Sequence, residues 1–392
     1  MAEERKRRRP TQIDIARRAG VSQATVSQVI NGVSGDYQIA PATRQRVLDA
    51  VRELGYVANP VARSLKSGRN QMLGLYTFEA VFPTDHRDFY HPFLQGVEAE
   101  AAERGYDLVL FTSAGAARER GLFAGGANRL KVADGCVLLG RHLRRAELAR
   151  LAEEDFPFVF IGRREIEGAR ISYVAADYAT ATSRIVAELA KLGHRRIRYL
   201  KVPGDAEPTR DRLSGFRRGL KEAGLEPVGT EAGLEPVGTE AGLEPVGKGA
   251  GLEAVGKKAG LEAVGVHLVA EPGELRPGLV RTWLDDGVTA FVVEPTEDDR
   301  AAAALCAAAE EAGAAVPADC SVAVLGDPPS YCSPPRDWMR FAIPREQMGR
   351  DAVDLLIGLL NTPDAEARTL LVPCAFLRGA TAGPVPGAER RS

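Results

Sequence analysis

Residues 11–31 read TQIDIARRAGVSQATVSQVIN, and this stretch predicts two short helices joined by a tight turn. Thr11, with Asp14 three residues later, has the pattern of a capping box, in which side-chain oxygens accept hydrogen bonds from the unpaired N–H groups of a helix start. Gly20 can adopt the positive φ that the turn requires without steric cost. Ser22 is then placed to cap the second helix.

The second helix is expected to have one buried and one exposed face. Apolar residues at i, i+3 and i+4 spacing must face inward, together with apolar residues of the first helix and the turn. The inward positions are Val26, Val29 and Ile30, with Ile13, Ala16 and Val21. The opposite face carries Gln23, Ala24, Ser27 and Gln28. Such short, uncharged side chains suit a helix that touches base edges in a major groove, although an ordinary helical hairpin with a polar solvent face has the same pattern.

Two further helical segments are predicted after this pair. Residues 41–54 form a third helix, whose inward positions are expected at Val47, Leu48, Val51 and Leu54. Asn59 as a cap and Pro60 at the first helical position then start a segment that Ser67-Gly68 ends after only two turns. So short a helix is unstable alone in water, so this segment should fold only when something packs against it.

Several short motifs follow one another in a recognisable order. They are Ile15-Ala16, Ala19-Gly20-Val21-Ser22, Thr25-Val26-Ser27, Val29-Ile30-Asn31, Thr43-Arg44, Leu54-Gly55-Tyr56 and Asn59-Pro60-Val61-Ala62-Arg63-Ser64-Leu65. Over residues 10–69 the chain resembles, nearly end to end, the DNA-binding headpiece and hinge of the LacI/GalR (lactose-repressor) family. It departs from the family at 32–40, where a few extra residues precede the third helix, and at Gln28, where many relatives have Arg.

The resemblance implies a homodimer that binds an approximately palindromic double-stranded DNA operator. In the family, two hinge helices pair in the minor groove and a leucine wedges into the central base step, which is the position of Leu65. The residues expected to contact DNA are Thr11, Ser22, Gln23, Ala24, Thr25, Ser27, Gln28, Asn31, Asn59, Ala62 and Leu65.

Composition indicates a soluble globular protein of two or three domains, because the chain has 392 residues and is 45% hydrophobic. No apolar run approaches the roughly 20 residues of a membrane span, and no apolar segment follows the charged N-terminus as in a signal peptide. We therefore expect a cytoplasmic, nucleoid-associated protein. The five cysteines are scattered without a CxxC pair, so they are expected to be buried or free thiols. The histidines show no ligand spacing either, so neither a metal nor a cofactor is expected.

Charge is divided unevenly along the chain. Residues 1–69 hold 13 Lys or Arg against 6 Asp or Glu, a net charge of +7, while the remainder holds 38 against 47, a net charge of −9. A basic head on an acidic body is typical of a nucleic-acid-binding protein whose body has another role. The basic run at 5–9 is expected to lie along DNA phosphates.

From residue 72 onward strands and helices alternate, which predicts parallel sheets with helices on both faces. Strands are expected at 72–77, 107–112, 135–139, 156–161, 197–202 and 290–293, and helices at 93–104, 178–192 and 213–223. A dinucleotide-binding enzyme would have the same alternation, but no GxGxxG motif follows the first strand.

The predicted fold class is an N-terminal all-α helix-turn-helix headpiece plus an α/β periplasmic-binding-protein-like core of two subdomains, as the family resemblance implies. The expected domains are a helix-turn-helix domain at 1–58, a hinge helix and linker at 59–70, and an effector-binding and dimerisation core at 71–383. Within this core, subdomain 1 is expected at about 71–175 and 328–343, and subdomain 2 at about 176–327 and 344–383.

Residues 223–265 contain five copies of a nine-residue unit, of which AGLEPVGTE is the first. One Leu and one Val per unit, with two Gly, offer too small an apolar face for a solenoid. We expect an inserted loop that is extended or disordered, and a binding role for it stays open.

The effector site is expected in the core. Arg212 matches the family's effector-binding arginine, whose fork suits carboxylate, phosphate or sugar hydroxyl groups. Phe89 and Tyr90 stand where relatives place aromatic residues that stack on the effector. Asp177 and Asp327 are further candidates, although a helix cap and a surface carboxylate would explain them equally well.

Two family motifs of the effector site are altered. The family's Asn-Asp pair is replaced by EPTE at 294–297, and its glycine-aromatic-Asp-Asp run by VLGD at 324–327. The effector could therefore be a sugar, a different metabolite, or none.

These observations predict a transcription regulator, a repressor controlled by a small molecule, with no catalytic residues. The alternative is a DNA-binding regulator whose core has lost or changed effector binding. A cytoplasmic enzyme would need a nucleophile with a base or paired carboxylates, and no such motif is found. A solute-binding protein would need an export signal and no basic head.

Overall fold

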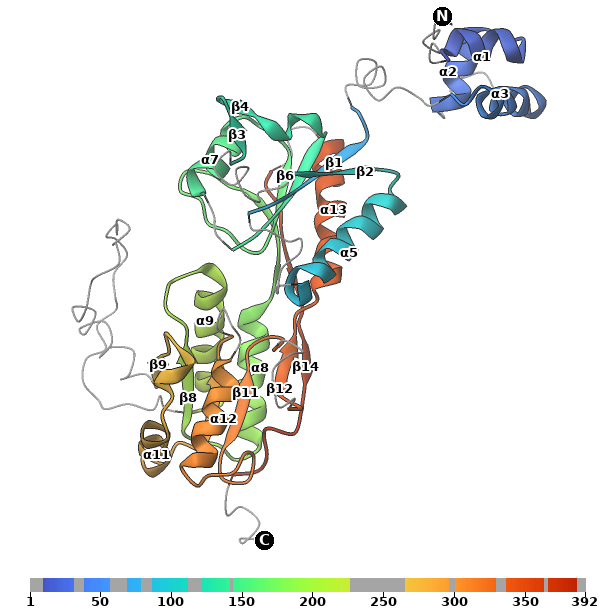
Figure 1. Cartoon of the computed structure of the whole chain (residues 1–392). Helices are drawn as coiled ribbons and strands as arrows, with labels where there is room; N and C mark the ends of the chain where they lie inside the picture. Colours follow the sequence, from blue (N-terminus) through green and yellow to red (C-terminus); the bar gives the residue numbers. More distant parts are fainter. Residues whose placement is uncertain are drawn as a thin grey trace, which may run out of the picture. The chain divides into compact units, whose positions relative to one another are not determined.

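In the computed structural model the described residues are 10–31, 39–56, 69–78, 87–111, 121–141, 144–225, 265–295, 300–328, 336–362 and 366–385. They belong to two compact units, Met1–Gln71 and Met72–Ser392, shown in Figure 1. The predicted repeats between 226 and 264 and the hinge between 57 and 68 lie outside the described residues. Among the described helices, none combines the length and the apolarity that are needed to cross a membrane.

The first unit contains three helices, α1 (Gln12–Ala19), α2 (Gln23–Asn31) and α3 (Pro41–Leu54). These bounds confirm the predicted helix pair and the third helix. The buried residues at their junction are Ile15, Ala16, Ala19, Val26, Val29, Val47 and Ala50. Val21, Ile30, Val51 and Leu54 pack against this cluster.

Two apolar residues of this unit are not where the sequence placed them. Ile13 is 54% exposed and Leu48 is 37% exposed, so the prediction that they face inward is wrong. Each helical residue is rotated about 100° from the one before it, so Ile13 lies far around the helix from the buried Ile15. Leu48 directly follows the buried Val47, so it points about 100° away from Val47 around the helix.

The first sheet of the second unit has the order β13-β7-β6-β5-β1-β2, and the strand pairs that form it are parallel. Its strands are β1 (Met72–Thr77), β2 (Asp107–Phe111), β5 (Gly135–Leu139), β6 (Phe158–Ile161), β7 (Ser172–Ala176) and β13 (Thr369–Val372). The helices α5 (Arg87–Glu103) and α13 (Arg345–Asn361) pack together on one face (Figure 1). Helix α7 (Arg145–Glu153) packs on the other. Because both faces are covered, β5 and β6 are apolar along their whole length.

The second sheet has the order β14-β12-β11-β10-β8-β9, and β14 is antiparallel to β12. Its strands are β8 (Ile197–Lys201), β9 (Val266–Leu268), β10 (Ala290–Val293), β11 (Ser321–Val324), β12 (Met339–Ala342) and β14 (Ala375–Leu377). One face packs on α8 (Tyr178–Lys191) and α9 (Glu207–Glu222). The other packs on α11 (Pro277–Asp285) and α12 (Ala301–Glu311). The remaining small elements are the hairpin β3 (Phe123–Ala124) and β4 (Ala127–Asn128), and the 3₁₀ turns η1 (Arg129–Val132) and η2 (Pro272–Glu274).

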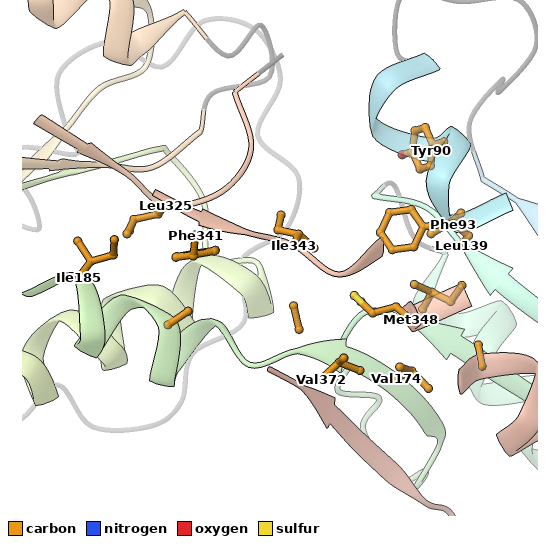
Figure 2. Close-up of a cluster of buried hydrophobic side chains, with 14 of the residues drawn as sticks. Tyr90, Phe93, Leu139, Val174, Ile185, Leu325, Phe341, Ile343, Met348 and Val372 are labelled. Atoms are coloured by element: carbon orange, nitrogen blue, oxygen red, sulfur yellow. The ribbon is translucent and has the colours of Figure 1, made fainter. Parts of the chain in front are cut away.

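The sheet topology corrects the predicted division of the C-terminal part of the core. Strand β12 pairs with β11 in the second sheet, although 328–343 was assigned to subdomain 1. Helix α13 and strand β13 belong with the first sheet, although 344–383 was assigned to subdomain 2. The chain therefore passes between the sheets after β7, after β12 and after β13. Figure 2 shows apolar side chains from both sides around these connections, including Phe341, Ile343, Met348 and Val372.

Most core elements lie where the sequence predicted them, with differences at some helix starts. Strands β1, β5 and β10 have the predicted bounds. A helix was expected at 93–104, but α5 starts earlier, at Arg87, and continues through Pro92. Helix α9 starts six residues earlier than predicted, at Glu207, with a proline in its first turn where the N–H is not needed.

Glycines allow the closest helix contact in the first subdomain. A Cβ on Gly96 of α5 would lie 1.9 Å from the Glu346 carbonyl oxygen, and a Cβ on Gly349 of α13 would lie 2.3 Å from the Phe93 carbonyl oxygen. Both positions face backbone atoms, which cannot move away as a flexible side chain could. The two helices therefore approach so closely only because each has glycine at the crossing.

The cysteines of the described residues are free thiols, as predicted. Cys136, Cys306 and Cys320 are buried, and Cys374 is partly buried. Burial raises the pKa of the Cys320 thiol to about 11, so this group stays protonated at neutral pH. These side chains act as small apolar groups in the core. Cys332 lies outside the described residues.

Candidate functional site

The start of the helix pair is fixed by the predicted capping box. Thr11 donates from its backbone N to Asp14 Oδ2 at 2.9 Å, and Asp14 donates from its backbone N to Thr11 Oγ1 at 3.4 Å. Gly20 has φ 65° and ends α1. Ser22 Oγ accepts from the Thr25 backbone N at 3.1 Å and so caps α2. These local bonds fix the angle at which α2 leaves the turn.

The predicted DNA-contacting residues of α2 lie at its accessible surface. Ser22, Gln23 and Ala24 are exposed at the helix start, while Thr25, Ser27 and Gln28 are half-buried. Asn31 is the last residue of the helix. The other predicted contacts, Asn59, Ala62 and Leu65, lie outside the described residues. Ser22, Gln23 and Ala24 are therefore exposed as DNA contact would require, and contact itself stays a prediction.

Basic side chains are exposed on the two helices that pack with α2. Arg17, whose side chain is highly exposed, lies in the last turn of α1. Arg44 and Arg46 are exposed on α3. Arg18 is held by Glu53 of α3, with 2.7 Å between Nη2 and Oε2. Exposed arginines beside a polar helix face suit phosphate contacts around a base-reading element.

A cavity of about 900 Å³ lies at the carboxyl ends of the strands of both sheets. Its wall includes Ile161 and Ala176 from the first sheet, and Val202, Pro295 and Ile343 from residues at or just after the ends of strands in the second. Open α/β sheets bind ligands in crevices of this kind. Aromatic and apolar side chains with a few charged groups are the usual lining of a small-molecule site.

Arg212 lines the cavity from α9, and its side chain is only 8% exposed. Its Nε donates to the Leu325 carbonyl oxygen at 3.1 Å, and its guanidinium carbon lies 4.1 Å from the centre of the Tyr178 ring. The fully buried Glu294 lies nearby, with 4.0 Å between Arg212 Nη1 and Glu294 Oε1. The carbonyl and the ring hold the guanidinium group in one orientation.

Glu294 is a buried acid beside this arginine. Burial raises its pKa above the usual range, although the Arg212 charge and a 2.9 Å hydrogen bond from the Val202 backbone N act in the opposite direction. It does not itself line the cavity. The sequence showed only that Glu294 replaces part of a family motif, and its burial beneath Arg212 depends on contacts between distant segments.

The two predicted aromatic residues also line the cavity. The rings of Phe89 and Tyr90 meet edge to face, with 4.9 Å between their centres. The guanidinium carbons of Arg141 and Arg345 lie 4.5 and 5.0 Å from the centre of the Phe89 ring. Phe89 therefore supports two arginines at the cavity wall.

The two predicted aspartates are placed differently. Asp327 lines the cavity, but its carboxylate accepts from the Ile343 backbone N at 2.9 Å and also contacts Arg340 and Arg345. Asp177 is not part of the cavity wall, and its Oδ1 accepts from the Thr180 backbone N at 2.9 Å at the start of α8. Asp177 thus has the helix-cap role that was its alternative, and Asp327 is largely occupied by protein partners.

Sequence reasoning missed a group of charged residues that joins the two subdomains beside the cavity. Glu207, at the start of α9 and 2% exposed, contacts Arg145 of the first subdomain with 2.8 Å between Oε1 and Nη2. The Glu165 backbone N donates to the same oxygen at 3.1 Å. A second bridge runs from Arg210 Nη2 to Glu165 Oε2 at 2.6 Å. These contacts connect the segment after β6 to α9.

Replacing Glu207 with Gln should weaken this connection. Burial raises the pKa of Glu207, but hydrogen bonds from backbone N–H groups and Arg145 outweigh burial and hold the pKa below its usual value. A lowered pKa stabilises the fold above the unfolded pKa, and this stabilisation is lost as pH falls through the folded pKa. We expect a loss of about 1.5–3 kcal/mol at pH 7, because charged hydrogen bonds are removed.

Urea denaturation of the full chain at several pH values measures this effect. The difference between the wild type and Glu207→Gln should shrink in acid, below the ordinary carboxyl range. Asp285→Asn is the matched control, since it removes a highly exposed pair with Arg281 and should cost less than about 1 kcal/mol. Equal losses in the two variants would show that the Glu207 contacts add no more than a surface pair.

Comparison with known proteins covers both units. Residues 11–59 match the family described as bacterial regulatory proteins, lacI family. Residues 77–232 match periplasmic binding proteins and sugar binding domain of LacI family, and residues 186–381 match the periplasmic binding protein-like domain.

Among curated proteins, the HTH-type transcriptional regulator CelR of Thermobifida fusca is 36% identical over 223 residues, which are 56% of this chain and 64% of the relative. The ribose operon repressor of Escherichia coli (strain K12) is 32% identical over 55% of this chain and 62% of the relative. The matched part therefore spans somewhat less than two thirds of these relatives.

Solved structures share the fold. A structure of the transcriptional regulator CelR in complex with cellobiose has a TM-score of 0.54 and 27% identity, and the match covers 95% of this chain and 100% of that one. The lac repressor dimer bound to operator and the anti-inducer ONPF has a TM-score of 0.62 and 20% identity, with 96% and 100% covered. The chain belongs to the lacI family of bacterial regulatory proteins, with a core of the periplasmic binding protein-like type.

Proposed function

We propose that the chain is a homodimeric, sequence-specific DNA-binding protein that represses transcription and is controlled by a small molecule in the core cavity. The observation that carries this proposal is the presence, in one chain, of an exposed polar helix start at Ser22–Ala24 and a ligand-sized cavity lined by Arg212. The first feature suits a duplex and the second suits a metabolite. We expect the protein to act in the cytoplasm, on the nucleoid.

Related proteins support each part of the proposal. The related CelR structure is a cellobiose complex, and the lac repressor structure is a dimer on its operator. A dimer presents two identical heads, which suits a palindromic site with two half-sites. From the similarity to the lac repressor structure, we infer that the hinge at 59–70 contacts DNA together with the helix-turn-helix domain.

A ligand can control DNA binding if it binds two arrangements of the core with different affinities. The cavity is walled by both subdomains, so a bound molecule changes the free energy of any motion between them. If the operator selects one arrangement of the dimer, the ligand shifts the operator affinity by the same coupling free energy. The residues proposed to bind the effector are Phe89, Tyr90 and Arg212, with Asp327 at the wall.

Titration of the full chain against a random DNA duplex at several salt concentrations tests the DNA-binding part. A head with a net charge of +7 should bind with an affinity that falls steeply as salt rises, because phosphate contacts release counterions. An affinity that does not depend on salt would refute binding through this head.

Changing Gln28 to Arg should alter which sequence is recognised. Glutamine pairs well with adenine N6 and N7, whereas arginine favours guanine O6 and N7. We expect the preference at one symmetric base position to change by roughly 1–3 kcal/mol per contact. Binding-site selection with both proteins measures this change. Identical selected motifs would show that Gln28 does not face a base.

A further inference from the structure

Two arginines contact the residues that follow strand β11. The Leu325 carbonyl oxygen accepts from Arg212 Nε at 3.1 Å, and two residues later Asp327 Oδ2 lies 3.3 Å from Arg345 Nη2. Arg212 comes from α9 of the second subdomain, and Arg345 is the first residue of α13. One short loop therefore brings guanidinium groups from two helices to the same part of the cavity wall.

Each guanidinium group is supported by an aromatic ring. Arg212 lies 4.1 Å from the centre of the Tyr178 ring, and Arg345 lies 5.0 Å from the centre of the Phe89 ring. Their side chains are 8% and 12% exposed. Because the aromatic rings already hold these long side chains in place, the side chains lose little further conformational entropy when a ligand binds.

Both arginines keep hydrogen-bond donors for a ligand. Within the described residues, Arg212 makes its side-chain hydrogen bond through Nε, and its nearest acid, Glu294, stands 4.0 Å from Nη1, beyond hydrogen-bonding distance. Arg345 Nη2 lies 3.3 Å from Asp327 Oδ2, and its Nε is closed to solvent and has no hydrogen-bond partner among these residues, so a ligand would be held by the Nη groups.

The cavity wall is rich in donors and poor in acceptors. In the described part of the chain, the charged residues of the wall are the cations Arg141, Arg164, Arg212 and Arg345 and the acids Glu271 and Asp327. Asp327 is occupied by Arg340, Arg345 and a backbone N–H, and Glu271 is exposed. The hydroxyl groups of a neutral sugar both donate and accept, so a sugar site also needs free acceptors such as carboxylate, amide or carbonyl oxygens. An anionic group needs only donors and positive charge, which this wall supplies.

We propose that the cavity binds a sugar-sized anion whose phosphate or carboxylate group is held between Arg212 and Arg345. This inference rests on the proposed function, since the anion is the effector. Arg345 then has a role that family resemblance did not assign to it. The planar forks of the two arginines offer paired N–H donors to the oxygens of the anion.

Inorganic phosphate is the first probe, used with the full chain. We expect phosphate to raise the melting temperature of the wild type more than potassium chloride does at matched ionic strength. In Arg345→Gln the additional rise should be at least halved, and Arg345→Lys, which keeps the charge without the fork, should lie between. Arg350→Gln is the control, because Arg350 lies on the same helix but pairs with Glu100 and Glu103 outside the cavity.

Phosphate also stabilises proteins without binding to them, so the comparison between proteins decides the result. An equal rise in all four proteins, or no rise beyond chloride, would overturn the inference. A cooperative melting transition without added anion shows that each variant is folded. Calorimetry with glucose, glucuronate and glucose 6-phosphate then identifies the anion. We expect one of the two anions to bind at least tenfold more tightly than glucose, with the advantage lost in Arg345→Gln.

The same titrations, repeated on the operator complex, separate this inference from the proposed function. If a neutral sugar binds better than either anion and changes operator affinity, the regulatory proposal stands and the anion inference is wrong. If an anion binds through Arg345 but leaves operator affinity unchanged, the anion site stands and the regulatory proposal is wrong.

Discussion

Replacing Arg212 with Ala is expected to abolish the response to effector while operator binding without effector barely changes. The side chain is buried at the cavity wall, where Leu325 and Tyr178 hold its guanidinium group in one orientation. Its loss removes charge-assisted hydrogen bonds and leaves part of the ligand unpaired. We expect effector binding to weaken by about 2–5 kcal/mol.

A reporter gene under a selected operator measures the consequence. A variant that cannot bind effector cannot be shifted between arrangements, so Arg212→Ala should repress continuously. Arg218→Ala is the matched control, because Arg218 lies on the same helix, is more exposed and is not part of the cavity wall. If Arg212→Ala responds at the same effector concentration as the control, Arg212 has only a structural role.

Replacing Gly349 with Ala should destabilise the core, whereas the same change at Gly358 on the same helix should not. A Cβ at Gly349 would lie 2.3 Å from the Phe93 carbonyl oxygen and 2.9 Å from the Val97 backbone N, so α5 and α13 would have to separate. Forced separation of packed elements costs about 1–3 kcal/mol or more. At Gly358 nothing lies within 4 Å of the added Cβ, and alanine favours the helix by about 0.5–1 kcal/mol.

Thermal unfolding of the three proteins tests this prediction. Gly349→Ala should melt several degrees below the wild type, and Gly358→Ala at or slightly above it. Equal melting temperatures for the two variants would mean that the crossing of α5 and α13 is loosely packed and does not depend on glycine at this position.

Local features of the fold could be predicted from the sequence because neighbouring residues determine them. The capping box of Thr11 and Asp14, the turn at Gly20 and the cap at Ser22 each depend on atoms within a few residues. Strand β10 has its predicted bounds, because a buried parallel strand is a continuous apolar run that ends where polarity begins.

Features that depend on distant contacts were predicted less well. Ile13 and Leu48 are as apolar as buried residues, and only the packing of three helices decides which positions face inward. The assignment of β12 and α13 was exchanged, since strand pairing across a sheet leaves no trace in either segment alone.

The candidate site shows the same contrast. Arg212, Phe89 and Tyr90 were predicted from motifs and line the cavity. The partners that occupy Asp327 come from Arg340 and Arg345, and no local pattern predicts that pairing. The group around Glu207 was missed because its residues are far apart in the sequence and meet only when the subdomains are assembled.

The most direct measurement of the central claim is a titration of two DNA duplexes with the full chain. One duplex carries the sequence obtained by binding-site selection, and the other has the same base composition in scrambled order. At physiological salt we expect the selected duplex to bind at least about a thousandfold more tightly, as specific regulators do. Equal affinity for the two duplexes would contradict the account, because the head would then bind phosphates without reading bases.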